Sequence, residues 1–454
     1  MIKLDSRQKD ILTFLGIELT FAYFWSLMYR QQLYDNLLIG GDIGLSDVNG
    51  PILQQLMGSS VNLWNLFATL VFQISPVLLV PAWNFIFFIS SFSMPVGIYI
   101  LLKQLKFRRT SQGVGSIFYS LNPLSILMGV DWEYSFLLFF IPLIFLFLFR
   151  FYKSREFKEI LLADVTLFLF FFIMGIDYVK FLIFIIIPFI FLFIISKSLK
   201  NALRNVLTVG VAIGILLIML APLVVSTIEA FFLFEASAST NSNVSSALYS
   251  IARFEYSSSS IQGTIYALPY VANQLTSIMY ENSWFGLLYF SLISVSIIFG
   301  ITSHNKYREV NLSLVIVLGF LLIFQYGVYN GTFLFLFKDP YVDIYNYPLF
   351  FYFTQMFIYT FFFSQLLEYI ANRVESIHLI SSRNKIRRLA VVTFTVIIVG
   401  IILISSTPVI QYEIQANPAG VKSGAPDYLT NLTEALKGYQ GQRIMVLPDN
   451  VTSL

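Results

Sequence analysis

Long apolar runs recur along this chain, separated by shorter polar connections. A helix needs about 20 apolar residues to cross the hydrocarbon core of a membrane. Runs such as 136–149 lack the alternation of a membrane β-strand, and backbone groups in lipid must hydrogen-bond within the chain, so these runs predict helices. We predict an all-α polytopic membrane protein with about eleven spans, at 11–29, 83–102, 113–130, 135–152, 161–176, 180–196, 205–230, 284–302, 311–329, 348–371 and 389–406.

The charges between the runs predict which helix ends share a side. We treat 62–80 as an interfacial outer helix interrupted by prolines, because counting it as a twelfth span would put Lys103 to Arg109 outside. All but seven of the 28 Lys and Arg residues then lie on the side of the N-terminus, which the positive-inside rule makes cytoplasmic. The five Trp residues fall on the other side, as an interfacial belt would. We therefore predict a multi-pass protein of the cell membrane with a cytoplasmic N-terminus and an extracytoplasmic C-terminus.

Three of the predicted outer connections are long: 30–82, 231–283 and 330–347. Loops of this length are usually functional or disordered, so we expect the function at the outer face. We divide the chain into a membrane domain, 1–406, and an extracytoplasmic tail, 407–454. The tail has an amphipathic stretch and then the strand-like Arg443–Pro448, a pattern typical of the start of an outer α/β domain.

Composition removes several kinds of chemistry. The chain is 57% hydrophobic and only 12% charged, whereas about a quarter of a soluble domain is charged. It has no Cys, which excludes disulfides, thiolate nucleophiles and Cys-ligated metals. Its two His residues, His304 and His378, both lie in polar connections. We expect membrane lipids, and no nucleic acid, among its partners.

Asp42 stands in the turn Gly40-Gly41-Asp42-Ile43-Gly44 of the first outer connection. The glycines free the backbone to present the carboxylate without steric conflict. Such a carboxylate could act as a general base that deprotonates an attacking hydroxyl. Asp is also common in turns that have no other role, so both interpretations stay open.

Asp131 and Glu133 flank Trp132 in the short second outer connection. Together with Asp42 they could hold a divalent cation, because oxygen ligands suit Mg²⁺ or Mn²⁺. Alternatively, the two acids cap the N-terminus of the next helix, whose dipole favours negative charge.

Basic residues are rare on the predicted outer side, which makes Lys180, Arg30 and Lys338 candidate phosphate ligands. Each could equally be an anchor whose charged head reaches the headgroup layer. Glu18 and Asp164 lie within predicted spans. A charge there usually has a partner, so Glu18 could be an ion or proton site or a protonated, hydrogen-bonded side chain.

The order of motifs along the first 155 residues is similar to that of a known protein superfamily. A Gly-Asp in the first outer loop is followed by Trp64-Asn65, an interfacial segment, and Ser116–Pro123 at the start of the third span. This layout resembles the GT-C superfamily of membrane glycosyltransferases, and is most similar to its arabinofuranosyltransferase-related branch and the archaeal relatives of that branch. Arg443–Pro448 is also similar to the start of the outer domain there. The chain departs from many relatives at Tyr345–Pro348, which no Arg follows.

The resemblance implies transfer of a sugar from a polyprenyl-phosphate donor to a glycan or glycoprotein acceptor at the outer face. The catalytic acid of the family maps onto Asp42. The Asp-x-Glu of oligosaccharyltransferases, a more distant branch, matches Asp131 and Glu133 in position.

Two other classes stay open. A transporter or lipid flippase would show inverted repeats, and we find no convincing repeat between the halves. A non-catalytic membrane anchor of an outer assembly would have the same helices with no cavity beside Asp42.

Overall fold

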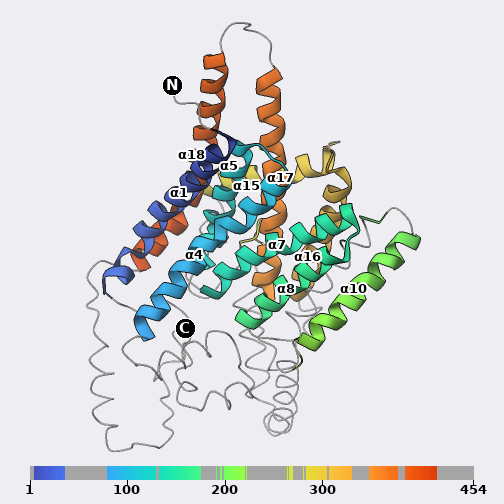
Figure 1. Cartoon of the computed structure of the whole chain (residues 1–454). Coiled ribbons are helices and arrows are strands. Elements are labelled where there is room, and N and C mark those ends of the chain that lie inside the picture. The colour runs from blue at the N-terminus through green and yellow to red at the C-terminus, as the bar shows by residue number, and fades with distance from the viewer. Residues whose placement is uncertain are drawn as a thin grey trace, which may run out of the picture.

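The computed structural model of the chain describes residues 5–35, 79–128, 132–174, 199–219, 283–303, 306–329, 347–376 and 384–416, and a few positions between them, among them 263 and 265–268. Every regular element in these ranges is a helix. The helices, labelled as in Figure 1, are α1 (Ser6–Asp35), α4 (Leu79–Gln104), α5 (Arg109–Ser120), α6 (Pro123–Met128), α7 (Trp132–Ser154), α8 (Phe157–Met174), α10 (Leu199–Met219), α15 (Trp284–Thr302), α16 (Arg308–Tyr329), α17 (Tyr347–Ser376) and α18 (Asn384–Ala416).

The lengths and apolar character of these helices confirm a helical membrane protein. Among the described residues, six stretches are long and apolar enough to cross a membrane: Ser6–Met28, Phe85–Gln104, Ser135–Ser154, Trp284–Thr302, Arg308–Tyr326 and Val391–Gln411. The total of eleven spans stays a prediction, since 180–196 lies almost wholly outside the described residues. The interfacial segment 62–78 and the tail from 417 on also lie outside them, and α18 runs past the predicted end at 406.

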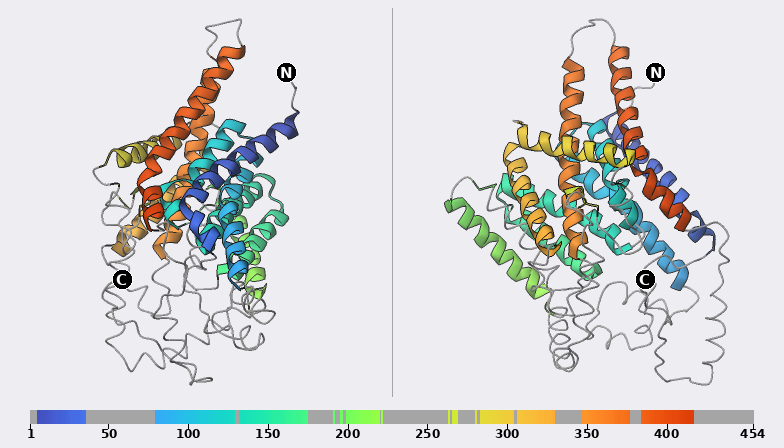
Figure 2. Two further views of the ribbon diagram at one scale, coloured as in Figure 1. Left: turned by 90° about the vertical axis from the view of Figure 1, so that its left-hand side faces the viewer. Right: turned by 180° about the vertical axis from the view of Figure 1, so that it is seen from behind.

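α17 lies at the centre of the bundle. It packs against α5, α7, α15, α16 and α18, and nearly all its side chains between Phe351 and Ser364 are buried. On one flank α4, α7, α8 and α10 follow one another, with α10 outermost (Figure 1). At one end of the bundle α17 and α18 project beyond the other helices, which the view from behind also shows (Figure 2).

The predicted third span, 113–130, is divided into two short helices, α5 and α6. Pro123 cannot donate a backbone hydrogen bond and disfavours a helical residue before it. The fully buried Asn122 joins the two helices: its side-chain amide donates to the carbonyl oxygen of Tyr119 (2.6 Å), and its Oδ1 accepts from the N–H of Ser125 (3.0 Å). One side chain thus caps the end of α5 and the start of α6.

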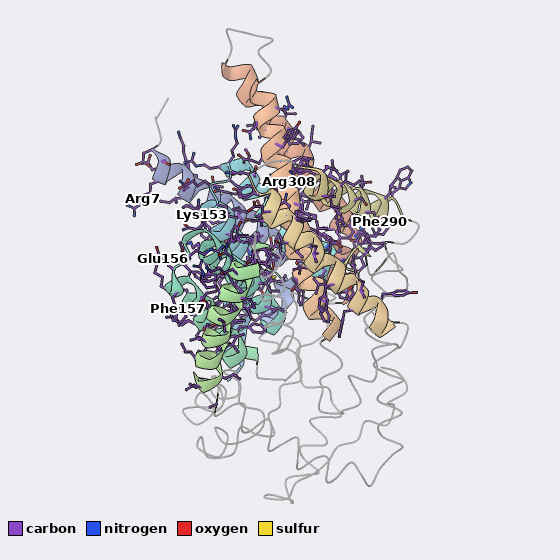
Figure 3. All side chains as sticks on the ribbon, turned by 90° about the vertical axis from the view of Figure 1, so that its right-hand side faces the viewer. Arg7, Lys153, Glu156, Phe157, Phe290 and Arg308 are labelled. Atoms are coloured by element: carbon purple, nitrogen blue, oxygen red, sulfur yellow. The ribbon has the colours of Figure 1, made fainter. Side chains whose placement is uncertain are left out.

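Polar contacts tie helix ends together on the side to which α17 projects; we call this the basic end. Asp10 of α1 forms salt bridges with Lys103 of α4 (3.3 Å) and Arg109 of α5 (2.7 Å). Three further contacts join α7 to its neighbours: Arg150 to Gln104 (2.8 Å), Arg155 to Asn205 (2.6 Å), and Tyr152 to Glu309. Figure 3 shows Arg7, Lys153 and Arg308 toward this same end. The helix ends whose charges predict the same side of the membrane therefore lie together at one end of the bundle.

The predicted Trp belt is not uniform. Trp284, at the start of α15, is 79% exposed, as an interfacial residue would be. Trp25 is 2% exposed and packs against Phe87 and Phe92 of α4, with ring centroids 5.6 and 5.7 Å away. Its position near the outer part of α1 suggested the interface, but the neighbouring helix covers it.

The turn after α4 is a helix cap built on a strained residue. Lys106 has a φ of 61°, in the left-handed region where a Cβ crowds the backbone. The N–H of Phe107 donates to the carbonyl oxygen of Leu102 and that of Lys106 to the carbonyl oxygen of Lys103, both at 3.0 Å. This is a Schellman motif, in which glycine is the usual left-handed residue.

Replacing Lys106 with glycine should raise the free energy of unfolding by about 0.5–1 kcal/mol, because relief of the strain exceeds the entropy that glycine adds to the unfolded chain. The measurement is denaturant unfolding of the purified chain in detergent. Lys106→Ala removes the same charge but keeps the Cβ, so it should give no gain. An equal gain from both variants would show that charge, and not backbone strain, is relieved.

Glycine lets α4 and α7 approach closely. A Cβ at Gly97 would lie 2.3 Å from the carbonyl oxygen of Phe139 in α7, and one at Gly300 of α15 would lie 2.5 Å from the ring of Phe362 in α17. Membrane helices use such small residues for close backbone packing.

Gly97→Ala should lower the free energy of unfolding by about 1–3 kcal/mol, because backbone atoms of α7 have to move away. Gly319 of α16 provides a matched control, since no atom lies within 4 Å of a Cβ built there. Gly319→Ala should leave stability unchanged or raise it slightly. Equal losses in the two variants would contradict the close-packing account.

Candidate functional site

The described residues cover the candidate catalytic side chains only in part. Asp42, Asp131, Lys180 and Lys338 lie outside the described residues, and for Arg30 and Glu133 the description covers the backbone alone. Arg30 lies in the last turns of α1, and Glu133 lies in the first turn of α7. Both helices have their other ends in the basic end, so the 30–82 connection and α7 both begin at the opposite end of the bundle.

Part of the second long connection, 231–283, lies inside the bundle, although a surface loop was expected there. Ala267 and Leu268 are completely buried. Ala267 has a φ of 55°, and the N–H of Leu268 donates to the carbonyl oxygen of Gly263 (2.8 Å). Residues 265–268 thus form a compact turn, which we call the buried turn.

Side chains of α15 and α17 hold the buried turn. Gln355 donates its side-chain N–H to the carbonyl oxygen of Ile265 (2.9 Å), and the hydroxyl of Tyr359 donates to the same oxygen. The hydroxyl of Tyr289 donates to the carbonyl oxygen of Tyr266 (3.0 Å). The carbonyls of Ile265 and Tyr266 are therefore paired, as non-helical backbone within a membrane bundle requires.

The buried turn reaches about halfway along α15. The Tyr266 ring stacks on Phe290 (4.0 Å between centroids), and its hydroxyl lies 3.1 Å from Oγ of Ser294. Gln355 and Tyr359, which hold the turn, lie 8 and 12 residues from the start of α17, about 12 and 18 Å along its axis. The buried turn therefore lies beside the half of α17 that is away from the basic end.

Two hydrogen bonds join α18 to its neighbours in the interior of the bundle. The hydroxyl of Ser406 donates to the carbonyl oxygen of Leu121, at the break between α5 and α6 (2.5 Å). The buried Tyr280 donates its hydroxyl to the carbonyl oxygen of Ser405 (2.7 Å). Sequence reasoning assigned no role to Gln355, Tyr359 or Ser406; polar residues inside or next to a predicted span were the available signal.

Two acids predicted to lie inside spans are largely buried. Asp164 of α8 is 4% exposed, and Glu18 of α1 is half-buried. Within the described part of the chain, Oδ2 of Asp164 and Oε1 of Glu18 accept no hydrogen bond.

No protein-family model, no curated protein and no solved structure matches this chain. Its function is therefore inferred from its own residues and from their arrangement.

The two donors to the Ile265 carbonyl allow a double-mutant test of the buried turn. Tyr359→Phe and Gln355→Leu each leave that oxygen one donor. Tyr359→Phe should lower the free energy of unfolding by about 1 kcal/mol, and Gln355→Leu by more, because Gln355 also bonds Tyr359 and Gln325. The double variant leaves it none and should lose about 1–3 kcal/mol more than the sum, as a buried unpaired carbonyl does. Unfolding in detergent measures all three. Strict additivity would mean that the two side chains do not share this oxygen.

Proposed function

We propose that this chain is an integral membrane glycosyltransferase of the GT-C type. It would transfer a sugar from a polyprenyl-phosphate donor to a glycan or glycoprotein acceptor at the end of the bundle opposite the basic end. The observation that supports this most is convergence at that end. α1 ends there and leads to Asp42, α7 begins there with Glu133 in its first turn, and the buried turn contacts the half of α17 nearer to that end.

In this proposal Asp42 takes the proton of an acceptor hydroxyl. The hydroxyl oxygen attacks the anomeric carbon of the donor sugar, the bond from that carbon to the phosphate oxygen breaks, and polyprenyl phosphate leaves. Asp131 and Glu133 would bind the acceptor or, with Asp42, a Mg²⁺ or Mn²⁺ ion. Lys180, Arg30 and Lys338 would contact the donor phosphate and compensate its charge.

The proposed orientation follows from the distribution of charge. Helix ends at the basic end carry most of the basic residues of the described chain, so this end would be cytoplasmic by the positive-inside rule. The N-terminus would then be cytoplasmic, the C-terminus extracytoplasmic, and the reaction would take place on the outer side of the cell membrane. A polyprenyl donor could enter sideways from the outer leaflet.

A transporter or lipid flippase is the second candidate, and the buried carboxyl groups of Glu18 and Asp164 favour it. A carrier that moves protons or cations would depend on such acids. It would lose transport in Glu18→Gln and be indifferent to Asp42, whereas the proposed transferase depends on Asp42. A non-catalytic anchor of an outer assembly would be indifferent to both substitutions.

Asp42→Asn should lower the rate of sugar transfer by about 10²–10⁴-fold, the usual contribution of a general base. The assay follows transfer from polyprenyl-phosphate sugars in membranes that contain the full chain. Asp47→Asn removes a carboxylate five residues away in the same connection and should leave the rate within about twofold of wild type, well short of that loss. An unchanged rate in Asp42→Asn would remove Asp42 from the mechanism.

A further inference from the structure

A cavity of about 640 Å³ opens at the basic end, far from the proposed transfer site. It lies between the end of α15, the α15–α16 turn and the second half of α17. Phe107, in the α4–α5 turn, lines it from the other side. Its volume is in the range of sites that hold small ligands.

Two aromatic pairs form walls of this cavity. Phe107 stacks on Tyr307 with ring centroids 5.3 Å apart and planes 15° apart, and Phe299 contacts Tyr369 at 5.6 Å. The hydroxyl of Tyr307 donates to the carbonyl oxygen of Leu105 (2.7 Å), which fixes its ring. Burial, and then the charge of Glu368, raise the pKa of Tyr307, so it stays protonated as this donor.

Most polar groups on the cavity wall already have partners. Gln365 exchanges two amide hydrogen bonds with Asn311, at 2.7 and 3.0 Å. Glu368 accepts from the backbone N–H of Arg108 (2.8 Å), and the guanidinium of Arg108 lies 3.6 Å from its other oxygen. Glu368, the one acid among the described residues that line this cavity, is thus matched by a positive charge.

Positive charge at the rim remains in excess. Arg373 donates its Nε–H to the hydroxyl of Tyr369 (3.0 Å) and stacks on that ring. Lys306 places its ammonium 4.8 Å from the centroid of the Tyr307 ring, and no acidic partner for it lies among the described residues. Asn372, also on the lining, is exposed and adds a donor amide.

We propose that this cavity binds a phosphate group carried by a membrane phospholipid. Ammonium and amide donors over a wall with excess positive charge suit phosphate oxygens. Ile298 and Ile301, each 59% exposed, line the last turns of α15 beside the cavity, and provide an apolar surface for acyl chains. The headgroup would lie where α15 leaves the membrane, between Lys306 and the aromatic walls. This site is separate from the proposed transfer site and does not depend on it.

The test compares Lys306→Gln with a matched control, Lys200→Gln. Lys200 is an exposed lysine at the start of α10, a helix on the outer flank of the bundle (Figure 1). The full chain is purified in detergent and titrated with phosphatidylglycerol or phosphatidylcholine, and bound lipid is counted by native mass spectrometry. A second arm adds inorganic pyrophosphate and measures the melting temperature.

Lys306→Gln should weaken retention of phosphatidylglycerol by about tenfold, the effect of losing one charge-assisted hydrogen bond. Lys200→Gln should change it less than about twofold, as expected for an exposed charge outside a site. If pyrophosphate instead raises the melting temperature of wild type and Lys200→Gln alone, with lipid retention equal in all three, a soluble phosphate is the ligand and the lipid assignment is wrong. Equal behaviour of the two variants in both arms overturns the phosphate site.

Discussion

Backbone hydrogen bonding inside a membrane bundle is the constraint on which this architecture depends, because a peptide group that leaves a helix there finds no water. The described part of the chain leaves regular helix inside the bundle at least twice. Each time, a buried polar side chain forms the hydrogen bonds that the backbone groups would otherwise lack. Asn122 serves both sides of the break between α5 and α6, and Ser406 supplies a further donor. Gln355 and Tyr359 serve the buried turn. Irregular backbone at this depth is therefore specifically supported.

The two halves of the bundle solve this problem with different chemistry. At the basic end, charged pairs such as Asp10 with Arg109 join helix ends at or near solvent, where desolvation is modest. In the opposite half, the side chains that pair with irregular backbone are amides and hydroxyls, which lose less free energy than ions on leaving water. The proposed phosphate site lies at the basic end and the proposed transfer site at the opposite end, so the two would have separate ligands.

Helices were predictable here because a span of about 20 apolar residues is a local property of the sequence. α15 has its predicted bounds, and the gathering of basic helix ends followed from charge alone. The break at Asn122 was missed although its signal, Asn122-Pro123, is local. The burial of Ala267 and Leu268 was missed because it depends on partners far away in the chain, such as Gln355. Asp42 was selected from a local turn motif, and it lies outside the described residues, so its role rests on the sequence and the resemblance.

The central position of α17 has a consequence for how the protein is made. This helix is absent from the six stretches apolar enough to cross a membrane unaided, and it carries the buried polar side chains Thr354, Gln355, Thr360, Ser364 and Gln365. Lipid would be a poor solvent for such a segment, because each polar side chain lowers its tendency to leave the translocon. α5, α7, α15 and α16 are synthesised earlier and provide the surfaces on which α17 packs. The central helix α17 is thus synthesised after most of the helices that surround it. Its integration into the membrane therefore depends on packing against helices that are already in place.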